Sequence, residues 1–343
     1  MDDEELKKDL DPQAQFEKTF TPLIHPNLAP DDNQRLKDIL FEYRHMFSET
    51  LNAHKPSKVP AMDVKLKPNV EIPKSLRGRP RRQAQAHEDE IQKQVTKLLL
   101  LGLIEEIDTC DFYSQVLVSN RTIIESDGSS TIKKRFCIDY RHLNDITEPY
   151  YWPLPVIDDI LQRLNGNRVF STLDLTMGFN QVKLTKEASR LSAFITSKGL
   201  YRYVRVPFGM KGGPAYFQRM VQDVVLRGLS PDICMVYIDD IIIFGKDHEE
   251  HARNLRTVLQ RLEEFDIIVK PGKCLFGSNK VKYLGHQVDA SGISISDDRK
   301  KHIASLRQPE TVSELHAFIG LIGFFRKHIK NLATTASSLY PWL

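Results

Sequence analysis

The chain has 343 residues, of which 41% are hydrophobic and 27% charged, and this composition excludes a disordered or fibrous protein. Its net charge of +3 neither supports nor excludes nucleic-acid binding, and its four cysteines form no CxxC pair that would indicate a zinc motif or a disulfide framework. It has no signal peptide and no apolar run of about 20 residues, so we expect no membrane association and a reducing, intracellular setting.

Residues 1–60 carry no chemical motif. Residues 1–20 are polar and charged and are predicted to be poorly ordered. Asp31 or Asp32 then begins a predicted helix, because apolar residues follow at spacings of three and four. Residues 48–60 are rich in Ser, Asn, Lys and Pro and predict a linker.

The next part of the chain predicts a strand, a helix and a hairpin. Residues 64–68 alternate as a short strand, and residues 73–82 form a basic stretch. Such a stretch is usually solvated surface, and a phosphate contact is the alternative. A helix is predicted at 88–101, and residues 112–140 predict a β-hairpin with a polar tip at 126–130.

The remaining elements alternate between helices and strands. Strands are predicted at 170–175, 182–184, 192–196, 201–206 and 281–288, the last with a bend at Gly285. Helices are predicted at 156–164, from Pro214 onward, around 255–265, and from a capping box at 311–314 to about Ile329. This order indicates an α+β protein whose sheet is covered by helices on one face.

Residues 233–244 are the most informative stretch, because Asp239 and Asp240 join two apolar strand segments. Adjacent acids in such a setting are costly unless a cation binds them. A plain hairpin turn is the alternative, although such turns favour Asp followed by Gly, and here Ile241 follows. Asp174 ends another strand and is expected beside Asp239. Three such acids can hold two Mg²⁺ ions.

Several motifs in order strongly resemble reverse transcriptases. The principal ones are residues 173–181, 206–218 and 237–240. Shorter pieces agree at 64–68, 135–144, 151–155, 269–274, 283–286 and 313–320. The chain is most similar to the pol product of gypsy-class LTR retrotransposons over about residues 60–343, and retroviral enzymes are more distant. Lys211 and Gly213 depart from the Asn-Ala that is common in the family.

The resemblance implies a right-hand polymerase fold with fingers, palm and a partial thumb. The palm would be ferredoxin-like and would carry a catalytic β-hairpin. The implied division is a 1–60 N-terminal extension with one helix and a linker, fingers at 61–148 and 184–206, palm at 149–183 and 207–290, and the start of the thumb at 291–343.

The resemblance also implies site residues. Asp174, Asp239 and Asp240 would be catalytic and would bind two Mg²⁺, with Mn²⁺ as a substitute. The incoming dNTP would contact Arg135, Phe179, Phe208, Gly209 and Lys273. In this set Arg135 grips the triphosphate, Phe179 excludes a 2′-hydroxyl, and Lys273 protonates pyrophosphate. Core packing is the alternative for Phe179, and a solvated turn lysine for Lys273. A second triphosphate grip stays open among Arg121, Lys133 and Lys134.

Primer and template contacts are implied for a third set. It comprises Asp139, Arg141, Tyr237, Leu284, Gly285, His286, His316, Gly320 and Phe324. The last three recur every four residues and share one helix face, which would follow the duplex minor groove. Helix–helix packing through Gly320, Gly323 and the aromatics is the alternative.

The function implied is RNA-directed DNA polymerase, which adds dNTPs to a primer 3′-hydroxyl on an RNA or DNA template during retrotransposon replication. Partners would include other pol modules, namely protease, ribonuclease H and integrase, in a longer polyprotein. We expect a cytoplasmic location in a virus-like particle, or a nuclear one. The alternative is a truncated or domesticated, non-catalytic nucleic-acid-binding fragment, against which the presence of all three acids argues.

Overall fold

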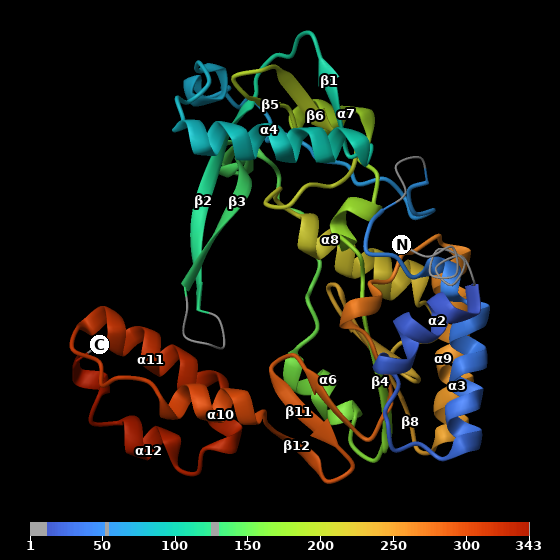
Figure 1. Ribbon diagram of the computed structural model, residues 1–343. Coiled ribbons are helices and arrows are strands. Elements are labelled where there is room, and N and C mark those ends of the chain that lie inside the picture. The colour runs from blue at the N-terminus through green and yellow to red at the C-terminus, as the bar shows by residue number, and fades with distance from the viewer. Residues whose placement is uncertain (1–11, 52–54, 125–129, 343) are drawn as a thin grey trace.

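The computed structural model describes residues 12–51, 55–124 and 130–342. Its strands form a five-stranded, a four-stranded and a three-stranded sheet. Figure 1 shows the five-stranded sheet at the top, the four-stranded sheet below it, and the C-terminal helices to one side at the bottom. Within the described residues, no helix has the length and apolar character needed to cross a membrane.

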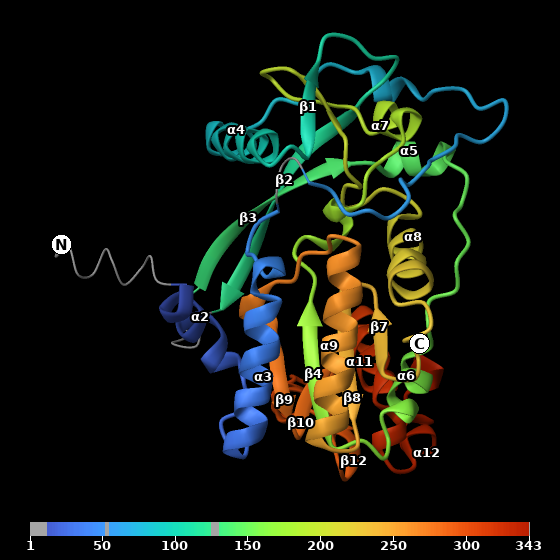
Figure 2. The same ribbon diagram turned by 90° about the vertical axis from the view of Figure 1, so that its right-hand side faces the viewer.

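The four-stranded sheet carries the acidic hairpin. Its order is β7–β8–β4–β9, with β4 at Val169–Asp174, β7 at Cys234–Tyr237, β8 at Asp240–Gly245 and β9 at Leu275–Ser278. Side chains alternate between the two faces, so Leu173 and Phe170 enter different hydrophobic cores. Helices α3 (Pro30–Glu42) and α9 (His248–Glu264) lie along one face, as Figure 2 shows. Helix α6 (Ile157–Arg163) packs against the other face.

The five-stranded sheet has the order β1–β6–β5–β2–β3. Its strands are β1 (Ile104–Ile107), β2 (Ser114–Ile124), β3 (Ser130–Asp139), β5 (Phe194–Ile195) and β6 (Leu200–Tyr203). Helices α4 (Gln85–Leu100), α5 (Arg141–Ile146) and α7 (Lys186–Leu191) accompany it. The predicted hairpin is confirmed as β2 and β3, while residues 126–129 of its predicted tip lie outside the described residues.

A helix and a π-helical turn connect the two sheets. The helix predicted from Pro214 is α8 (Gly213–Arg219), and Met220–Val225 continue it as the π-helical turn. The strand predicted at 182–184 forms only isolated bridges, such as Met62 to Leu184. The alternating stretch at 64–68 likewise makes a single bridge, Leu66 to Thr147.

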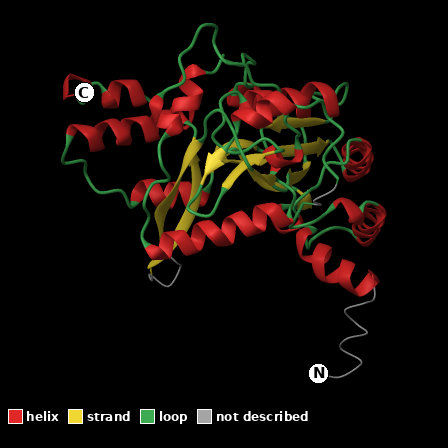
Figure 3. Cartoon of the chain, turned by 90° about the horizontal axis from the view of Figure 1, so that it is seen from above, coloured by secondary structure: helices red, strands yellow, loops and turns green. Residues whose placement is uncertain are grey.

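The C-terminal part begins with the three-stranded sheet. Strands β10 (Lys280–Tyr283), β11 (His286–Asp289) and β12 (Gly292–Ile295) are antiparallel neighbours. Helices α10 (Asp297–Ala304), α11 (Val312–Phe324) and α12 (Leu332–Ala336) follow, and Figure 1 shows them beside β11 and β12. Figure 3 shows the C-terminus among helices at the left side of the molecule. The capping box of Thr311 and Glu314 is confirmed. Helix α11 ends at Phe324 and not near Ile329, because the buried Phe325 turns inward before a 3-10 turn.

The N-terminal stretch differs from its prediction. Residues Pro12–Phe20 form a second helix, α2, whose Phe16 and Phe20 are both buried and stack at 4.8 Å between ring centroids. The expectation of disorder is therefore wrong for residues 12–20, because two aromatic rings four positions apart give this polar segment an apolar face. Residues 1–11 lie outside the described part of the chain.

The predicted linker at 48–60 is also packed where the structure describes it. Leu51, Ser57 and Val59 are buried. The amide and hydroxyl of Ser57 both donate to the carbonyl oxygen of Gln181, at 3.0 and 2.7 Å. Polar composition was misleading here, because the polar groups are satisfied by backbone far away in the sequence.

Candidate active site

The acidic hairpin turns through Ile238 and Asp239, since Tyr237 pairs directly with Asp240. Ile238 has φ 56°, a left-handed conformation that is strained for a β-branched residue. The fully buried side chain of Gln218 on α8 holds this turn. Its Oε1 accepts from the amide of Ile238 at 2.6 Å, and its Nε2 donates to the carbonyl of Val236 at 3.1 Å. The helix therefore imposes the turn, which lacks the glycine that a self-sufficient hairpin would use.

The strand register brings the three acids to one end of the sheet. Asp174 is paired in the register with Asp240, and it is close enough to the expected neighbour Asp239 to raise the pKa of Asp239. Asp239 lies one residue further, in the turn, where its carbonyl oxygen accepts from the amide of Leu175 at 3.2 Å. The proximity of the acids is thus set by a backbone ladder between strands about 65 residues apart.

These carboxylates disfavour one another's ionisation. Burial and the neighbouring Asp174 and Asp240 raise the pKa of Asp239 to about 6. Burial and Asp174 also raise the pKa of Asp240. The Oδ1 atom of Asp239 is buried without a hydrogen-bond partner. Such an oxygen is costly to bury, so a cation at this position would stabilise the site.

Lys273 supplies a cation to part of this cluster. Its Nζ lies 3.0 Å from Oδ2 of Asp174, and this contact raises the pKa of Lys273. In the described residues, no group of three or more His, Cys, Asp or Glu side chains is already arranged to hold a metal ion. The donor chemistry nevertheless fits a hard divalent cation, because the converging groups are carboxylate oxygens and one of them is unsatisfied.

A cavity of ≈ 520 Å³ is lined by helix α4, strand β3 and the segments at 177–180 and 208–209. Arg135, Phe208 and Gly209 line it together, as expected for a shared nucleotide site. Phe179 lies beside this cavity and is only 9% exposed. Its ring makes edge contacts with Phe208 at 5.1 Å and Phe217 at 5.2 Å between centroids. Core packing of Phe179 is thus observed, and its contact with Phe208 places it next to the cavity.

The three candidates for a second triphosphate grip differ in their surroundings. The Nζ of Lys134 donates to the carbonyl oxygen of Ala86 at 2.7 Å, which engages it with α4. Lys133 is exposed and is two residues from Arg135 on β3, so it lies on the same face of the strand. The side chain of Arg121 lies outside what the structure describes. Lys134 lines the cavity together with Arg135, but its ammonium is engaged by Ala86, and we therefore expect Lys133 to supply the second grip.

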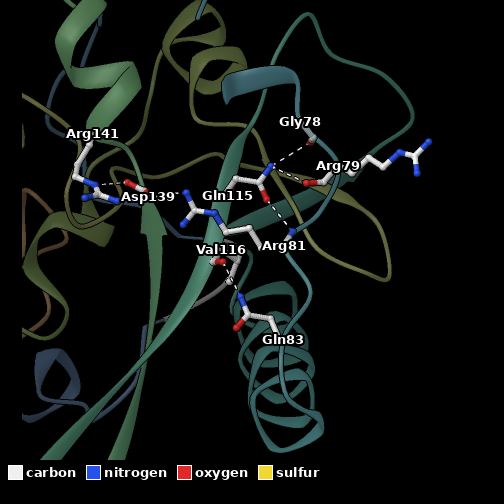
Figure 4. Close-up of polar contacts among 8 residues, drawn as sticks. All are labelled: Gly78, Arg79, Arg81, Gln83, Gln115, Val116, Asp139 and Arg141. Atoms are coloured by element: carbon white, nitrogen blue, oxygen red, sulfur yellow. Dashed lines mark hydrogen bonds and ion pairs between the residues drawn. The ribbon is translucent and has the colours of Figure 1, made fainter. Parts of the chain in front are cut away.

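Asp139 organises a polar cluster at the base of the β2–β3 hairpin (Figure 4). Its carboxylate accepts from Nε and Nη2 of Arg141, both at 2.8 Å, and from Nη2 of Arg81 at 3.2 Å. Hydrogen bonds from Arg141 lower the pKa of Asp139 to about 2. Asp139 is buried while Arg141 is exposed, so of the two it is Arg141 that can reach a nucleic-acid backbone.

The basic stretch at 73–82 is anchored rather than merely solvated. Gln115 donates to the carbonyl oxygens of Gly78 and Arg79 at 3.1 and 3.2 Å, and its Oε1 accepts from the amide of Arg81 at 3.1 Å. Figure 4 shows the side chain of Arg79 extending away from this cluster.

The predicted primer-side residues surround the β10–β11 turn. Leu284 and Gly285 both have positive φ, at 49° and 81°. The hydroxyl of Tyr283 donates to the carbonyl of Asp240 at 3.2 Å and so ties this turn to the acidic hairpin. Tyr237 is half-buried nearby, in the same hydrophobic core.

His286 is buried, at 4% exposed, although it was predicted among the primer-side residues. Its ring lies 5.4 Å from the ring centroids of both Phe324 and His328. In this arrangement its side chain joins the three-stranded sheet to the C-terminal helices instead of facing solvent.

The face of α11 is open where a duplex contact was predicted. His316, Gly320 and Phe324 are exposed. A Cβ added at Gly320 or Gly323 would meet no atom within 4 Å. Packing through these two glycines is therefore not observed in the described part of the chain, whereas the aromatic Phe324 does pack, against His286 and Phe325.

Lys211 and Gly213, which depart from the Asn-Ala common in the family, both have structural roles. The Nζ of Lys211 donates to the carbonyls of Asn144 and Thr147, at 3.2 and 2.9 Å, so this residue closes the end of α5. Gly213 begins α8 beside Val206. Gln218 ends the motif at 206–218, and the sequence predicts no role for it. Its role in holding the hairpin turn is visible only from its buried position on α8.

Comparisons with known proteins agree with this geometry. A family model described as reverse transcriptase (RNA-dependent DNA polymerase) matches residues 125–288. The Drosophila melanogaster Pol polyprotein from transposon 297 is 38% identical over 75% of this chain and 24% of its own length. The one from transposon opus is 32% identical over 92% of this chain and 31% of its own length. The chain thus spans about a quarter to a third of these relatives.

Solved structures show the same fold. The foamy viral protease-reverse transcriptase in complex with an RNA/DNA hybrid has a TM-score of 0.79 and 23% identity, and covers 96% of this chain and 42% of its own. The form of that protein with double-stranded DNA, at 24% identity, also has a TM-score of 0.79 and covers 96% of this chain and 55% of its own. The predicted right-hand polymerase fold is confirmed.

Proposed function

We propose that this chain, which belongs to the reverse transcriptase family, is an RNA-directed DNA polymerase that extends a primer with dNTPs in LTR-retrotransposon replication. One observation carries the proposal. The strained hairpin turn places Asp239, with its unsatisfied Oδ1, beside Asp174 and Asp240 at one end of the four-stranded sheet.

The family generally uses divalent metal ions, and we assign their binding to Asp174, Asp239 and Asp240. Two Mg²⁺ ions fit these oxygen donors, and Mn²⁺ is an acceptable substitute. When bound, the ions would activate the primer 3′-hydroxyl and stabilise the departing pyrophosphate. The raised pKa values of Asp239 and Asp240, which burial and the neighbouring acids cause despite Lys273, support this assignment.

The nucleotide site is assigned to the cavity beside these acids. Arg135, which lines the cavity, and Lys133 on the same face of β3 would bind the triphosphate, and Phe208 with Gly209 would support the base. Phe179 would block the 2′-position, since its ring is held rigidly by two other rings. Lys273 would donate a proton to the leaving pyrophosphate from its place beside Asp174.

Duplex binding is assigned to groups on both sides of the acids. Arg141 would contact the template side and is oriented by Asp139, while Tyr237, Leu284 and Gly285 would hold the primer end. His316, Gly320 and Phe324 would follow the minor groove, with His286 fixing the C-terminal helices against the palm. The foamy viral relatives were captured with an RNA/DNA hybrid and with double-stranded DNA, which supports this assignment.

Because the relatives are longer Pol polyproteins, we extend the proposal to partners. Protease, ribonuclease H and integrase would act in the same polyprotein. We assign the protein to cytoplasmic virus-like particles, or to the nucleus. A non-catalytic fragment is not favoured, because the acids and the nucleotide cavity are both present.

Primer extension tests the proposal directly. Folded protein with poly(rA)/oligo(dT), dTTP and Mg²⁺ should incorporate dTTP, and Asp239→Asn should abolish incorporation without unfolding the protein. Duplex binding without any incorporation would refute catalysis by this chain and support the non-catalytic alternative.

A further inference from the structure

The N-terminal unit reaches the catalytic end of the palm, although its sequence carries no motif. Residues 46–48 pair with Val269 through two backbone hydrogen bonds. The amide of Val269 donates to the carbonyl of Met46 at 2.9 Å, and the amide of Ser48 donates to the carbonyl of Val269 at 2.9 Å. The N-terminal segment thereby adds an outer row to the backbone ladder at this end of the sheet.

The next row of this ladder is the segment that carries the first catalytic acid. The amide of Lys270 donates to the carbonyl of Asp174 at 2.8 Å, and the amide of Thr176 donates to Ile268 at 3.0 Å. The hydroxyl of Thr176 also donates directly to the carbonyl of Ser48, at 2.7 Å. Residues 46–48, 268–270 and 174–176 are thus three adjacent rows, and the outermost comes from the N-terminal unit.

Glu49, which directly follows this row, contacts the turn that holds Lys273. This turn is the 3-10 turn Pro271–Lys273. Oε1 of Glu49 accepts from the amide of Gly272 at 3.2 Å, and Oε2 lies 3.4 Å from Nζ of Lys270. A Cβ added at Gly272 would lie 3.0 Å from the same Oε1, so the carboxylate lies close against this turn.

The outer row is itself held firmly. Met46 is buried, and the ring of Phe47 makes edge contacts with Phe20 at 5.0 Å and Phe276 at 6.1 Å between centroids. The carboxylate of Glu49 therefore projects from a fixed backbone, while Lys273 is a long and largely exposed side chain on a short turn. The hydrogen bond from Gly272, the residue before Lys273, to Glu49 limits the motion of that turn.

We propose that Glu49 is a positioning residue of the polymerase site, which acts by holding the 271–273 turn so that Lys273 stays beside Asp174. This inference rests on the proposed function of Lys273 as proton donor. The contact of Glu49 would also give the N-terminal unit a role in the chemical step, because a looser turn would misplace Lys273 relative to the leaving pyrophosphate.

A double-mutant cycle tests this assignment in the full-length chain. Single-nucleotide incorporation would be measured for Glu49→Ala, Lys273→Ala and the double variant. We expect Glu49→Ala to lower kcat about 3- to 10-fold, with a change below about 2-fold in KM for the dNTP, because only the proton transfer is affected. In the Lys273→Ala background the same substitution should have no further effect.

Two variants serve as controls. Glu49→Gln keeps an acceptor for the Gly272 amide and should retain most of the activity. Glu42→Ala removes a surface ion pair of the same N-terminal unit, at 3.1 Å from Arg256 on α9, and should match the wild type. A wild-type kcat for Glu49→Ala, or an equal loss in both backgrounds, would overturn the proposal.

Hydrogen exchange separates this proposal from the proposed function. The amide of Gly272 should exchange faster in Glu49→Ala than in Glu49→Gln or Glu42→Ala. If the wild type fails to extend a primer, the proposed function fails, and unchanged exchange at Gly272 would then refute the positioning contact independently.

Discussion

The backbone of Gly178 lies against the carboxylate of Asp239. A Cβ added at Gly178 would overlap Oδ1 of Asp239 and would lie 3.0 Å from Cγ of that residue and from Cζ of Phe217. Gly178 opens the 3-10 turn Gly178–Gln181, whose residues are buried. The glycine is thus required by the closeness of the acidic turn.

Gly178→Ala should therefore displace the carboxylate of Asp239. We expect a loss of about 10- to 100-fold in the rate of nucleotide incorporation, because a shift of about 1 Å misaligns reacting groups. The rate would be measured by rapid quench, with primer–template affinity and thermal unfolding as checks on folding. An alanine variant as active as the wild type would contradict this close contact.

Asp239→Asn should abolish synthesis and yet stabilise the metal-free protein at pH 7. The folded-state pKa of Asp239, about 6, lies above the ordinary value of 3.8, so its stabilising contribution is present at low pH and is lost as the pH rises from about 4 to about 6. Asparagine removes that loss. We expect a melting temperature a few degrees above the wild type at pH 7 in EDTA, and equal values at pH 4.

Mg²⁺ provides the second half of that experiment. The ion should raise the melting temperature of the wild type, because it binds the folded state, and should do so less in Asp239→Asn. Equal stabilisation of both proteins by Mg²⁺ would argue against Asp239 as a ligand.

Asp139→Asn should destabilise the protein at neutral pH, in contrast to Asp239→Asn. The folded-state pKa of Asp139 is about 2, below its ordinary value, so the carboxylate stabilises the fold above about pH 4 and this contribution is lost as the pH falls toward 2. We expect a cost of about 2 kcal/mol at pH 7 and a small cost at pH 2, measured by urea unfolding. Asp145→Asn, at an exposed position on α5, is the control and should be neutral at both pH values.

Phe179→Val should relax the selection of the sugar. A smaller side chain opens space beside the nucleotide cavity, so we expect the ratio of kcat/KM for rNTP to that for dNTP to rise at least about tenfold. The buried ring contacts with Phe208 and Phe217 also predict a lower melting temperature. A less stable variant with unchanged sugar preference would leave only the packing role.

Lys133→Ala and Lys134→Ala should differ in nucleotide affinity. Lys133 shares a strand face with Arg135, so its loss should raise KM for the dNTP about 5- to 10-fold. Lys134 is engaged with Ala86, and its loss should change KM less than about twofold. The reverse order of effects would assign the grip to Lys134.

Much of the fold could be predicted because local sequence patterns indicate its helices, strands and turns. The hairpin of β2 and β3, the capping box of α11 and the bend at Gly285 all follow from residues that are close together in the sequence. The prediction of disorder was wrong for residues 12–20 because their structure depends on contacts that are distant in the sequence. Their helix α2 has few apolar residues, and its burial depends on partners such as Phe41, which are distant in the chain.

The amino-acid sequence by itself determined the family and the three candidate acids, because each motif that carries them is contiguous. Only the tertiary structure decided that Asp174 pairs with Asp240, that Gln218 holds the strained turn, and that Glu49 reaches the turn of Lys273. Each of these contacts joins segments about 20 to more than 200 residues apart, and no local pattern encodes such a pairing. It arises when helices and strands pack and every buried polar group must find a partner.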